Sequence, residues 1–185
     1  MKKTIALFVL FLAAFQAVAQ ETTTERKGFI IGVSAGLGIS SITGDTPGIS
    51  DGIDISLPNL KVGLMINPKL AVLVTNPGIS YSRDGLDRSL DGFVPSVQYW
   101  AKPKWWISGG FGLAMDNPAF YDSKKTINDD YNFGTACQFS TGYELYKKGR
   151  FVIDLQGTLF AASVNTDWGT QETVSFLTGV GFNFY

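Results

Sequence analysis

The carboxy-terminal stretch constrains the fold of this chain more than any other segment. One face of it carries Val174, Phe176, Thr178, Val180, Phe182 and Phe184, and the other face carries Ser175, Gly179, Gly181 and Asn183. Strict alternation of apolar with small or polar residues is typical of a β-strand that has one buried or lipid-facing side. The chain ends on Tyr185 directly after this strand. The stretch therefore predicts a β-protein that is closed by its last strand.

The amino terminus has the features of a secretory signal peptide. Lys2 and Lys3 precede an unbroken apolar run over 5–15, and an Ala-Val-Ala cleavage site follows at 17–19. The run is too short to cross a bilayer as a helix, and we expect cleavage after Ala19. The expected organisation is a signal peptide over 1–19, a short linker over 20–27 and one folded domain over 28–185.

Eight segments of the expected folded domain alternate in the manner of strands. They cover 29–40, 58–66, 70–81, 93–101, 105–115, 131–145, 151–164 and 173–185. In the third segment both faces carry apolar residues, and Pro77 predicts a bulge or a break. No segment after the signal peptide has helical periodicity or approaches the ~18 apolar residues of a transmembrane helix. If the mature chain enters a membrane, it must do so as a closed barrel.

The connections between these strands alternate in length. Short turns with proline or glycine lie at 67–69, 102–104 and 147–150, and the long, Gly/Asp/Asn-rich connections are 41–57, 82–92, 116–130 and 165–172. Eight antiparallel strands whose two ends lie on one side require this arrangement of three and four connections. Outer-membrane β-barrels place short turns in the periplasm and long loops outside.

Charged residues are concentrated in the connections. The long connections hold 12 of the 16 acidic residues and four basic ones, whereas the short turns hold six basic residues and no acidic one. Lys61, Glu144 and Asp154 are the charges left inside expected strands, each on a polar face. A surface in water is usually ~25–35% charged, so the weakly charged face fits a packed lumen and the uncharged apolar face fits lipid. We therefore expect an all-β protein, an eight-stranded antiparallel up-and-down transmembrane β-barrel.

Aromatic residues gather where the expected strands reach the short turns. Amphipathic rings favour the membrane–water interface, so this distribution predicts an aromatic girdle. The alternative is that the rings form the core of an ordinary β-sandwich. The expected girdle residues are Tyr99, Trp100, Trp105, Trp106, Tyr143, Phe151, Phe184 and Tyr185.

These features together resemble the small outer-membrane β-barrel superfamily, with its OmpX-type and OmpA-transmembrane-type proteins, in the form typical of Bacteroidota. The resemblance covers 28–185 and includes the ending Gly-Val-Gly-Phe-Asn-Phe-Tyr. Phe184 is in register with the outward residues, as in the family, but Tyr185 lies one residue beyond it. The resemblance implies a monomeric outer-membrane protein in contact with membrane lipid and lipopolysaccharide.

The chemistry that the chain lacks limits its function. It has no histidine, which excludes His-based triads and imidazole bases; the deacylase, palmitoyltransferase, phospholipase and protease types of outer-membrane barrel all rely on histidine. Cys137 lies on an apolar face and is interpreted as a small filler, not a nucleophile. The acidic stretches at 51–54 and 129–130 could bind Ca²⁺ or Mg²⁺ but match no EF-hand spacing, so we expect a solvated surface there. We expect no enzymatic activity, no cofactor and no metal site.

Lys61, Glu144 and Asp154 are the candidate site inside the barrel. Eight strands leave a lumen just wide enough for side chains, so these charges are expected to form a structural ion-pair network, with a gate as the alternative. Buried charges need partners, and we expect Lys61 to contact at least one of the two carboxylates.

The sequence favours a non-enzymatic outer-membrane barrel that acts in envelope structure or through its loops on a surface partner. After cleavage 13 of the 15 basic residues remain against 16 acidic ones, a net charge of −3, and no basic patch predicts nucleic-acid binding. Two alternatives remain open. One is a small pore for ions or hydrophobic solutes, and the other is a soluble periplasmic ligand-binding barrel.

Overall fold

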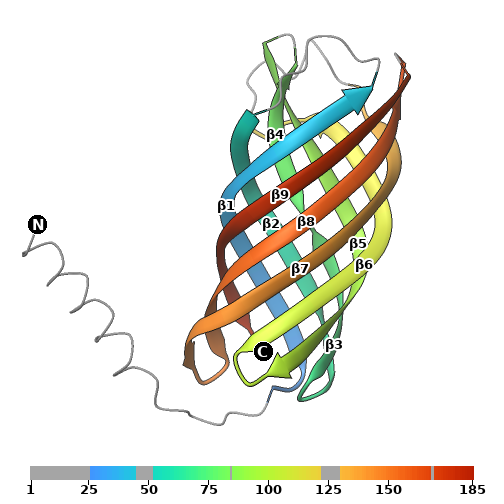
Figure 1. Ribbon diagram of the computed structural model, residues 1–185. Coiled ribbons are helices and arrows are strands. Elements are labelled where there is room, and N and C mark those ends of the chain that lie inside the picture. Colours follow the sequence, from blue (N-terminus) through green and yellow to red (C-terminus); the bar gives the residue numbers. More distant parts are fainter. Residues whose placement is uncertain (1–25, 45–51, 84, 122–129, 168) are drawn as a thin grey trace, which may run out of the picture.

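A closed ring of antiparallel strands makes up the folded part of the chain (Figure 1). The computed structural model describes residues 26–44, 52–83, 85–121, 130–167 and 169–185. The signal peptide expected over 1–19 and most of the linker over 20–27 lie outside the described residues. The described part contains no helix with the length and hydropathy of a membrane span.

Nine strands form the ring. Their bounds are β1 Phe29–Gly44, β2 Gly52–Asn67, β3 Leu70–Asn76, β4 Gly78–Arg83, β5 Leu86–Lys102, β6 Trp105–Pro118, β7 Asn132–Lys148, β8 Phe151–Thr166 and β9 Gly169–Phe184. β3 and β4 both pair with β5, one after the other along its length, so together they fill one position. β3 also pairs with β2, and β9 pairs with β1, which closes the ring. The predicted eight-stranded barrel is confirmed, with its third strand divided in two.

The division of the third strand falls at Pro77, as the sequence predicts. Proline has no backbone N–H and therefore interrupts a ladder, although its carbonyl still accepts a hydrogen bond from Gly92 N at 2.7 Å. Beyond this break, no ladder joins β4 to β2 in the described chain. Side chains hold the two strands together instead: Ser56 Oγ donates to Gly78 O at 2.6 Å, and Gly78 N donates to Asn59 Oδ1 at 2.8 Å.

The closing strand β9 is arranged as its sequence predicts. It pairs with β1 and with β8 without a shift in register. Phe176, Phe182 and Phe184 are exposed on the outside of the ring, whereas Ser175 and Asn183 are buried inside it. Both faces of the strand are therefore assigned correctly.

Two of the predicted long loops are strand hairpins. Most of 82–92 belongs to β4 and β5, and Gly85, directly before β5, has a φ of 76°. Most of 165–172 belongs to β8, which ends at Thr166, and to β9, which begins at Gly169. The prediction of loops is wrong for these segments. Their Gly, Asp, Asn and Ser residues have low strand propensity, but pairing with neighbouring strands outweighs this preference.

The other two predicted loops are shorter than expected. β2 already begins at Gly52, within the predicted loop 41–57, and β6 continues to Pro118, within the predicted loop 116–130. The central parts of both connections, 45–51 and 122–129, lie outside the described residues. At the loop end of the barrel, the strands therefore extend further beyond their predicted ends than they do at the turn end.

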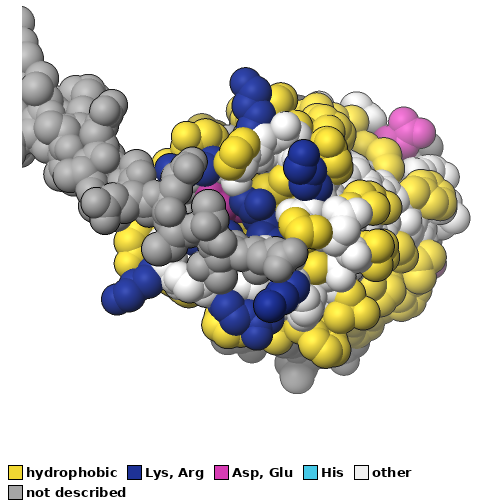
Figure 2. Space-filling view, turned by 90° about the horizontal axis from the view of Figure 1, so that it is seen from below, with side chains coloured by type: hydrophobic (Ala, Val, Ile, Leu, Met, Phe, Trp, Pro, Cys, Tyr) yellow, Lys and Arg dark blue, Asp and Glu magenta, His cyan; other side chains and the backbone are white. Residues whose placement is uncertain are grey.

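The outside of the ring is apolar. Exposed large apolar side chains occur on strands around the ring, among them Ile31, Leu64, Val97, Phe111 and Phe139. Hydrophobic side chains also surround the end face that is seen from below in Figure 2. Soluble monomers rarely expose contiguous apolar patches larger than a few hundred Å². The outer face therefore matches a lipid environment better than water.

Candidate functional site

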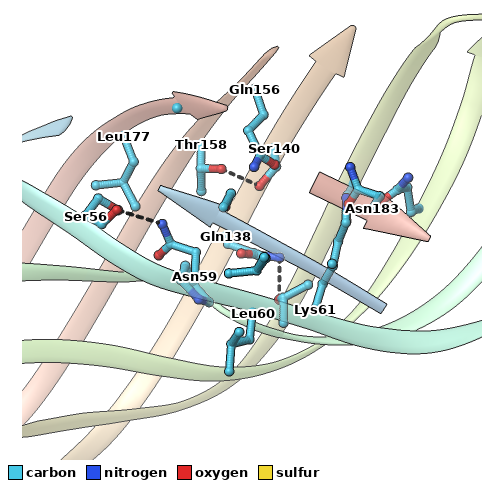
Figure 3. A pocket seen from close by; sticks show the side chains of 18 of the residues that line it. Ser56, Asn59, Leu60, Lys61, Gln138, Ser140, Gln156, Thr158, Leu177 and Asn183 are labelled. Carbon is cyan, nitrogen blue, oxygen red and sulfur yellow. Dashed lines mark hydrogen bonds between the residues drawn. The ribbon is translucent and has the colours of Figure 1, made fainter. Parts of the chain in front are cut away.

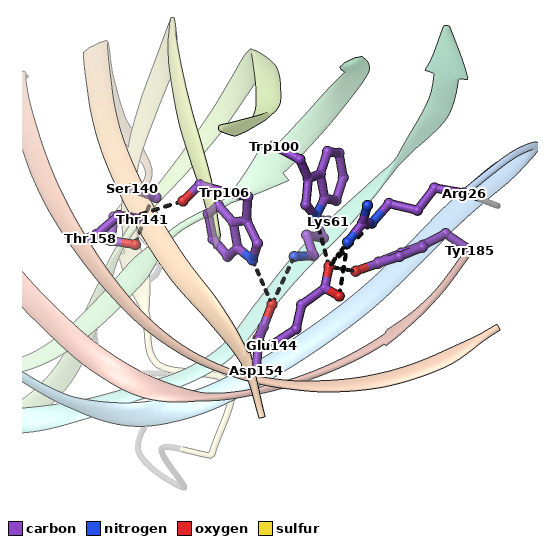
Figure 4. Close-up of polar contacts among 10 residues, drawn as sticks. All are labelled: Arg26, Lys61, Trp100, Trp106, Ser140, Thr141, Glu144, Asp154, Thr158 and Tyr185. Carbon is purple, nitrogen blue, oxygen red and sulfur yellow. Dashed lines mark hydrogen bonds and ion pairs between the residues drawn. The ribbon is translucent and has the colours of Figure 1, made fainter. Parts of the chain in front are cut away.

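Two tryptophans of the predicted girdle lie inside the barrel, at the turn end of the lumen. Trp100 and Trp106 are each 2% exposed and belong to a buried cluster with Tyr185, which was also predicted in the girdle. Successive residues of a strand face opposite sides. Of the neighbours Tyr99 and Trp100, only Tyr99 points outward, and of the neighbours Trp105 and Trp106, only Trp105 does. The girdle prediction is wrong for Trp100, Trp106 and Tyr185 (Figure 4).

The five other girdle residues lie on the outer surface. Tyr99, Trp105, Tyr143, Phe151 and Phe184 are all exposed. The indole N–H of Trp105 is hydrogen-bonded, because Nε1 donates to Thr141 Oγ1 at 2.7 Å. That these rings contact the membrane interface stays a prediction.

Glu144, 2% exposed, is the centre of a cluster that closes the turn end of the lumen. Trp100 Nε1 donates to its carboxylate at 2.7 Å, the Tyr185 hydroxyl also donates to it, and Arg26 forms an ion pair with it at 3.0 Å. The Arg26 guanidinium lies 4.8 Å from the Trp100 ring centroid and 5.9 Å from that of Tyr185 (Figure 4). Arg26 was not predicted as part of this site, because an isolated residue in the expected linker belongs to no periodic pattern.

Lys61 and Asp154 form a second, neighbouring cluster. Their charged atoms, Nζ and Oδ2, are 3.8 Å apart, so the predicted contact between Lys61 and a carboxylate is present. Trp106 Nε1 donates to Asp154 Oδ2 at 3.0 Å, and Lys61 Nζ lies 4.7 Å from the centroid of the same indole. The three predicted charges thus divide into two pairs, with Arg26 as the fourth member.

Polar side chains fill the middle of the lumen (Figure 3). Gln138 Nε2 donates to Thr75 Oγ1 at 2.6 Å, and Thr158 Oγ1 donates to Ser140 Oγ at 2.8 Å. The cavity between these groups has a volume of about 50 Å³, which is space for a few water molecules. The side-chain amide of Asn183 borders this cavity, and neither its nitrogen nor its oxygen has a protein hydrogen-bond partner. Ordered water molecules usually satisfy buried polar groups of this kind.

An apolar layer lies between this cavity and the loop end. Ile79, Leu90, Val94, Phe160 and Leu177 are buried there in one cluster. The sequence predicts a polar, weakly charged face toward the lumen, and this prediction is wrong for the apolar layer. Ile79 falls in the ambiguous third segment and Leu90 in a predicted loop, so neither could be assigned to a face from sequence.

A buried ion pair lies at the loop end. Arg88 is 1% exposed and Asp116 is 0% exposed, and Arg88 donates two hydrogen bonds to the Asp116 carboxylate, at 2.9 and 2.8 Å. Tyr81 OH and Asn132 Nδ2 donate to the same carboxylate at 2.6 and 3.1 Å. The sequence predicts Arg88 and Asp116 in long connections, and this is wrong because β5 and β6 extend to include both residues.

The described residues contain no group of three or more Cys, Asp or Glu side chains that could hold a metal ion. Of the acidic stretches considered for Ca²⁺, Asp51 and Asp129 lie outside the described residues. Cys137 is exposed on the outer face of β7, where the sequence places it.

Comparison with known proteins identifies the architecture. No protein-family model and no curated protein matches the sequence. The structure of Neisserial surface protein A matches with a TM-score of 0.61 and 16% identity, over 85% of this chain and 96% of that one. The chain has the fold of a small outer-membrane β-barrel. Ail, the attachment invasion locus protein of Yersinia pestis, matches with a TM-score of 0.53 and 14% identity, over 86% of this chain and all of that one.

The barrel presents an outer face, two ends and an interior. At these identities the two similar structures establish the fold of the barrel and leave its activity to be argued from its own residues. The interior has charged clusters at both ends and an apolar layer between them, so the exposed ends and the outer face are the surfaces on which a partner can bind.

Proposed function

We propose that this chain is a non-enzymatic, monomeric protein of the outer membrane that acts in envelope structure or by binding a surface partner at its loop end. The apolar outer face and the fold support membrane insertion. The absence of histidine from the sequence and the packing of the interior charges into ion pairs support a non-enzymatic role. We place the turn end in the periplasm and the loop end outside, where it meets lipopolysaccharide.

The observation that carries this proposal is the filled lumen. The Arg26–Glu144 cluster lies at the turn end, a cavity of about 50 Å³ lies in the middle, and the layer around Phe160 separates that cavity from the loop end. A pore needs a continuous polar path, and the apolar layer interrupts it. This argues against the alternative of a channel for ions.

The surface available to a partner is smaller than the sequence predicts. The hairpins over 82–92 and 165–172 leave only their turns as connections. The proposed binding surface therefore consists of the connections between β1 and β2 and between β6 and β7, together with those two turns.

Planar-bilayer recording tests the filled lumen directly. We expect the refolded barrel to insert without steady ohmic openings, because the apolar layer and both charged clusters block the path. A larger porin inserted in the same bilayers serves as the positive control. Reproducible openings of the refolded chain, with a single conductance level proportional to voltage, would establish the transport alternative.

The substitution Phe111→Arg tests the lipid-facing surface. Phe111 lies in the middle of β6 and is 68% exposed. If it contacts acyl chains, a charge there should lower the free energy of unfolding in lipid vesicles by about 2–4 kcal/mol. Phe120, equally apolar and exposed but beyond the end of β6, is the matched control, and Phe120→Arg should change this free energy much less. Equal effects at both positions would contradict a membrane-spanning β6.

A further inference from the structure

Basic side chains encircle the turn end of the barrel, where Figure 2 shows several of them around the end face. We call this set the basic ring; its members are Lys27, Lys69, Lys102, Lys104, Lys147, Lys148 and Arg150. The two described acidic side chains of this half, Glu144 and Asp154, are buried inside the lumen and paired there. Within the described chain, the basic ring therefore has no exposed acidic residue beside it.

Two members of the basic ring lie against rings of the outer, apolar face. Lys102 Nζ is 6.0 Å from the ring centroid of Trp105, and the Arg150 guanidinium is 4.7 Å from that of Phe184. Trp105 and Phe184 are both exposed on the outside of the barrel. These positive charges therefore lie at the border between the apolar band and the end face, which is where long basic side chains reach from an apolar surface to headgroups.

We propose that the basic ring binds the headgroups of anionic phospholipids in the periplasmic leaflet. The inference rests on the proposed membrane location and adds a lipid class to it. Lys and Arg are the residues that bind phosphate, and basic residues beside a membrane attract anionic lipids. The alternative partner, an acidic soluble protein, would require the basic side chains to point away from the bilayer. The contacts of Lys102 and Arg150 with lipid-facing rings instead favour a ligand within the leaflet.

The experiment compares the lipids retained by the barrel after mild detergent extraction from vesicles of phosphatidylcholine with a minor share of phosphatidylglycerol. Mass spectrometry of the intact complexes counts each lipid. We expect phosphatidylglycerol to be enriched over its share of the vesicle at low salt, and the enrichment to fall at high salt because surface charges are screened. Retained lipid with the vesicle's own composition would overturn the proposal.

The double variant Lys102→Gln/Arg150→Gln should lower the enrichment at least about fivefold, since each basic residue near the surface contributes about a fivefold preference. The matched control, Lys124→Gln/Lys125→Gln, removes two positive charges between β6 and β7 and should keep the enrichment. If the first variant does not fold, Lys69→Gln/Lys148→Gln replaces it. Equal enrichment in the test and control variants would overturn the proposal, whereas failure of the wild-type chain to insert would overturn the proposed function itself.

Discussion

Asp116→Ala is expected to lower the free energy of unfolding of the barrel by about 3–5 kcal/mol, the usual result of removing one partner of a buried ion pair. Arg88, 1% exposed, would be left as a buried guanidinium without its carboxylate. Tyr81 and Asn132 would lose an acceptor at the same time. The measurement is a denaturant titration of the refolded protein in lipid vesicles, followed by tryptophan fluorescence.

Two further variants separate the ion pair from general damage to β5 and β6. Asp87→Asn removes an exposed charge from the same hairpin as Arg88 and should change the free energy of unfolding by less than about 1 kcal/mol. The paired replacement Arg88→Met/Asp116→Leu should recover much of the loss, because replacing both buried charges by apolar side chains is often neutral. A loss below about 1 kcal/mol in Asp116→Ala would show that the pair is solvated and not part of a closed loop end.

Glu144→Ala is expected to lower the free energy of unfolding by about 2–4 kcal/mol. The substitution removes the acceptor shared by Trp100, Tyr185 and Arg26. Trp100 and Tyr185 are buried, so their donors cannot turn to bulk water. The same titration measures the loss, and the fluorescence of the folded state should also change because Trp100 loses its hydrogen bond.

A double-mutant cycle with Arg26→Ala measures how strongly the N-terminal segment holds the turn end. We expect Arg26→Ala alone to be destabilising, and its effect to shrink when Glu144 is already alanine, because contacting charges couple. Glu144→Gln should be intermediate, since its amide oxygen still accepts from Trp100. Strict additivity of the two alanine substitutions would contradict a functional contact between Arg26 and Glu144.

The strand pattern could be predicted from sequence because lipid and lumen impose opposite requirements on alternate residues. In β9 both requirements are met at nearly every position, and its two faces were assigned correctly. At Pro77 the missing N–H was enough to predict the break. These predictions depend on local chemistry, which the sequence displays directly.

The errors arose where local composition and tertiary pairing disagree. Arg88 and Asp116 lie among Asp, Asn and Ser residues that favour loops, yet extended strands bring them together inside the barrel. Trp100 was assigned to the girdle by its residue type, although its position next to Tyr99 already required it to face inward. Arg26 could not be found, because its partner is 118 residues away in sequence.

The interior clusters, in contrast, could be predicted only in part. Lys61 and Asp154 stand out as charges within alternating strands, and their contact was expected. Their surroundings were not, because the strand register determines which indole lies beside each charge. Only the structure shows that Trp106 contacts both members of this pair.

Fractionation of the native bacterium tests the central claim most directly. Cell envelopes separated on a density gradient, with the periplasm released beforehand, would be probed for the chain by an antibody. We predict recovery in the outer-membrane fraction, resistant to alkaline extraction and more mobile on gels before boiling than after it. Recovery in the soluble periplasmic fraction would contradict the account, because the apolar outer face would then have no lipid to contact.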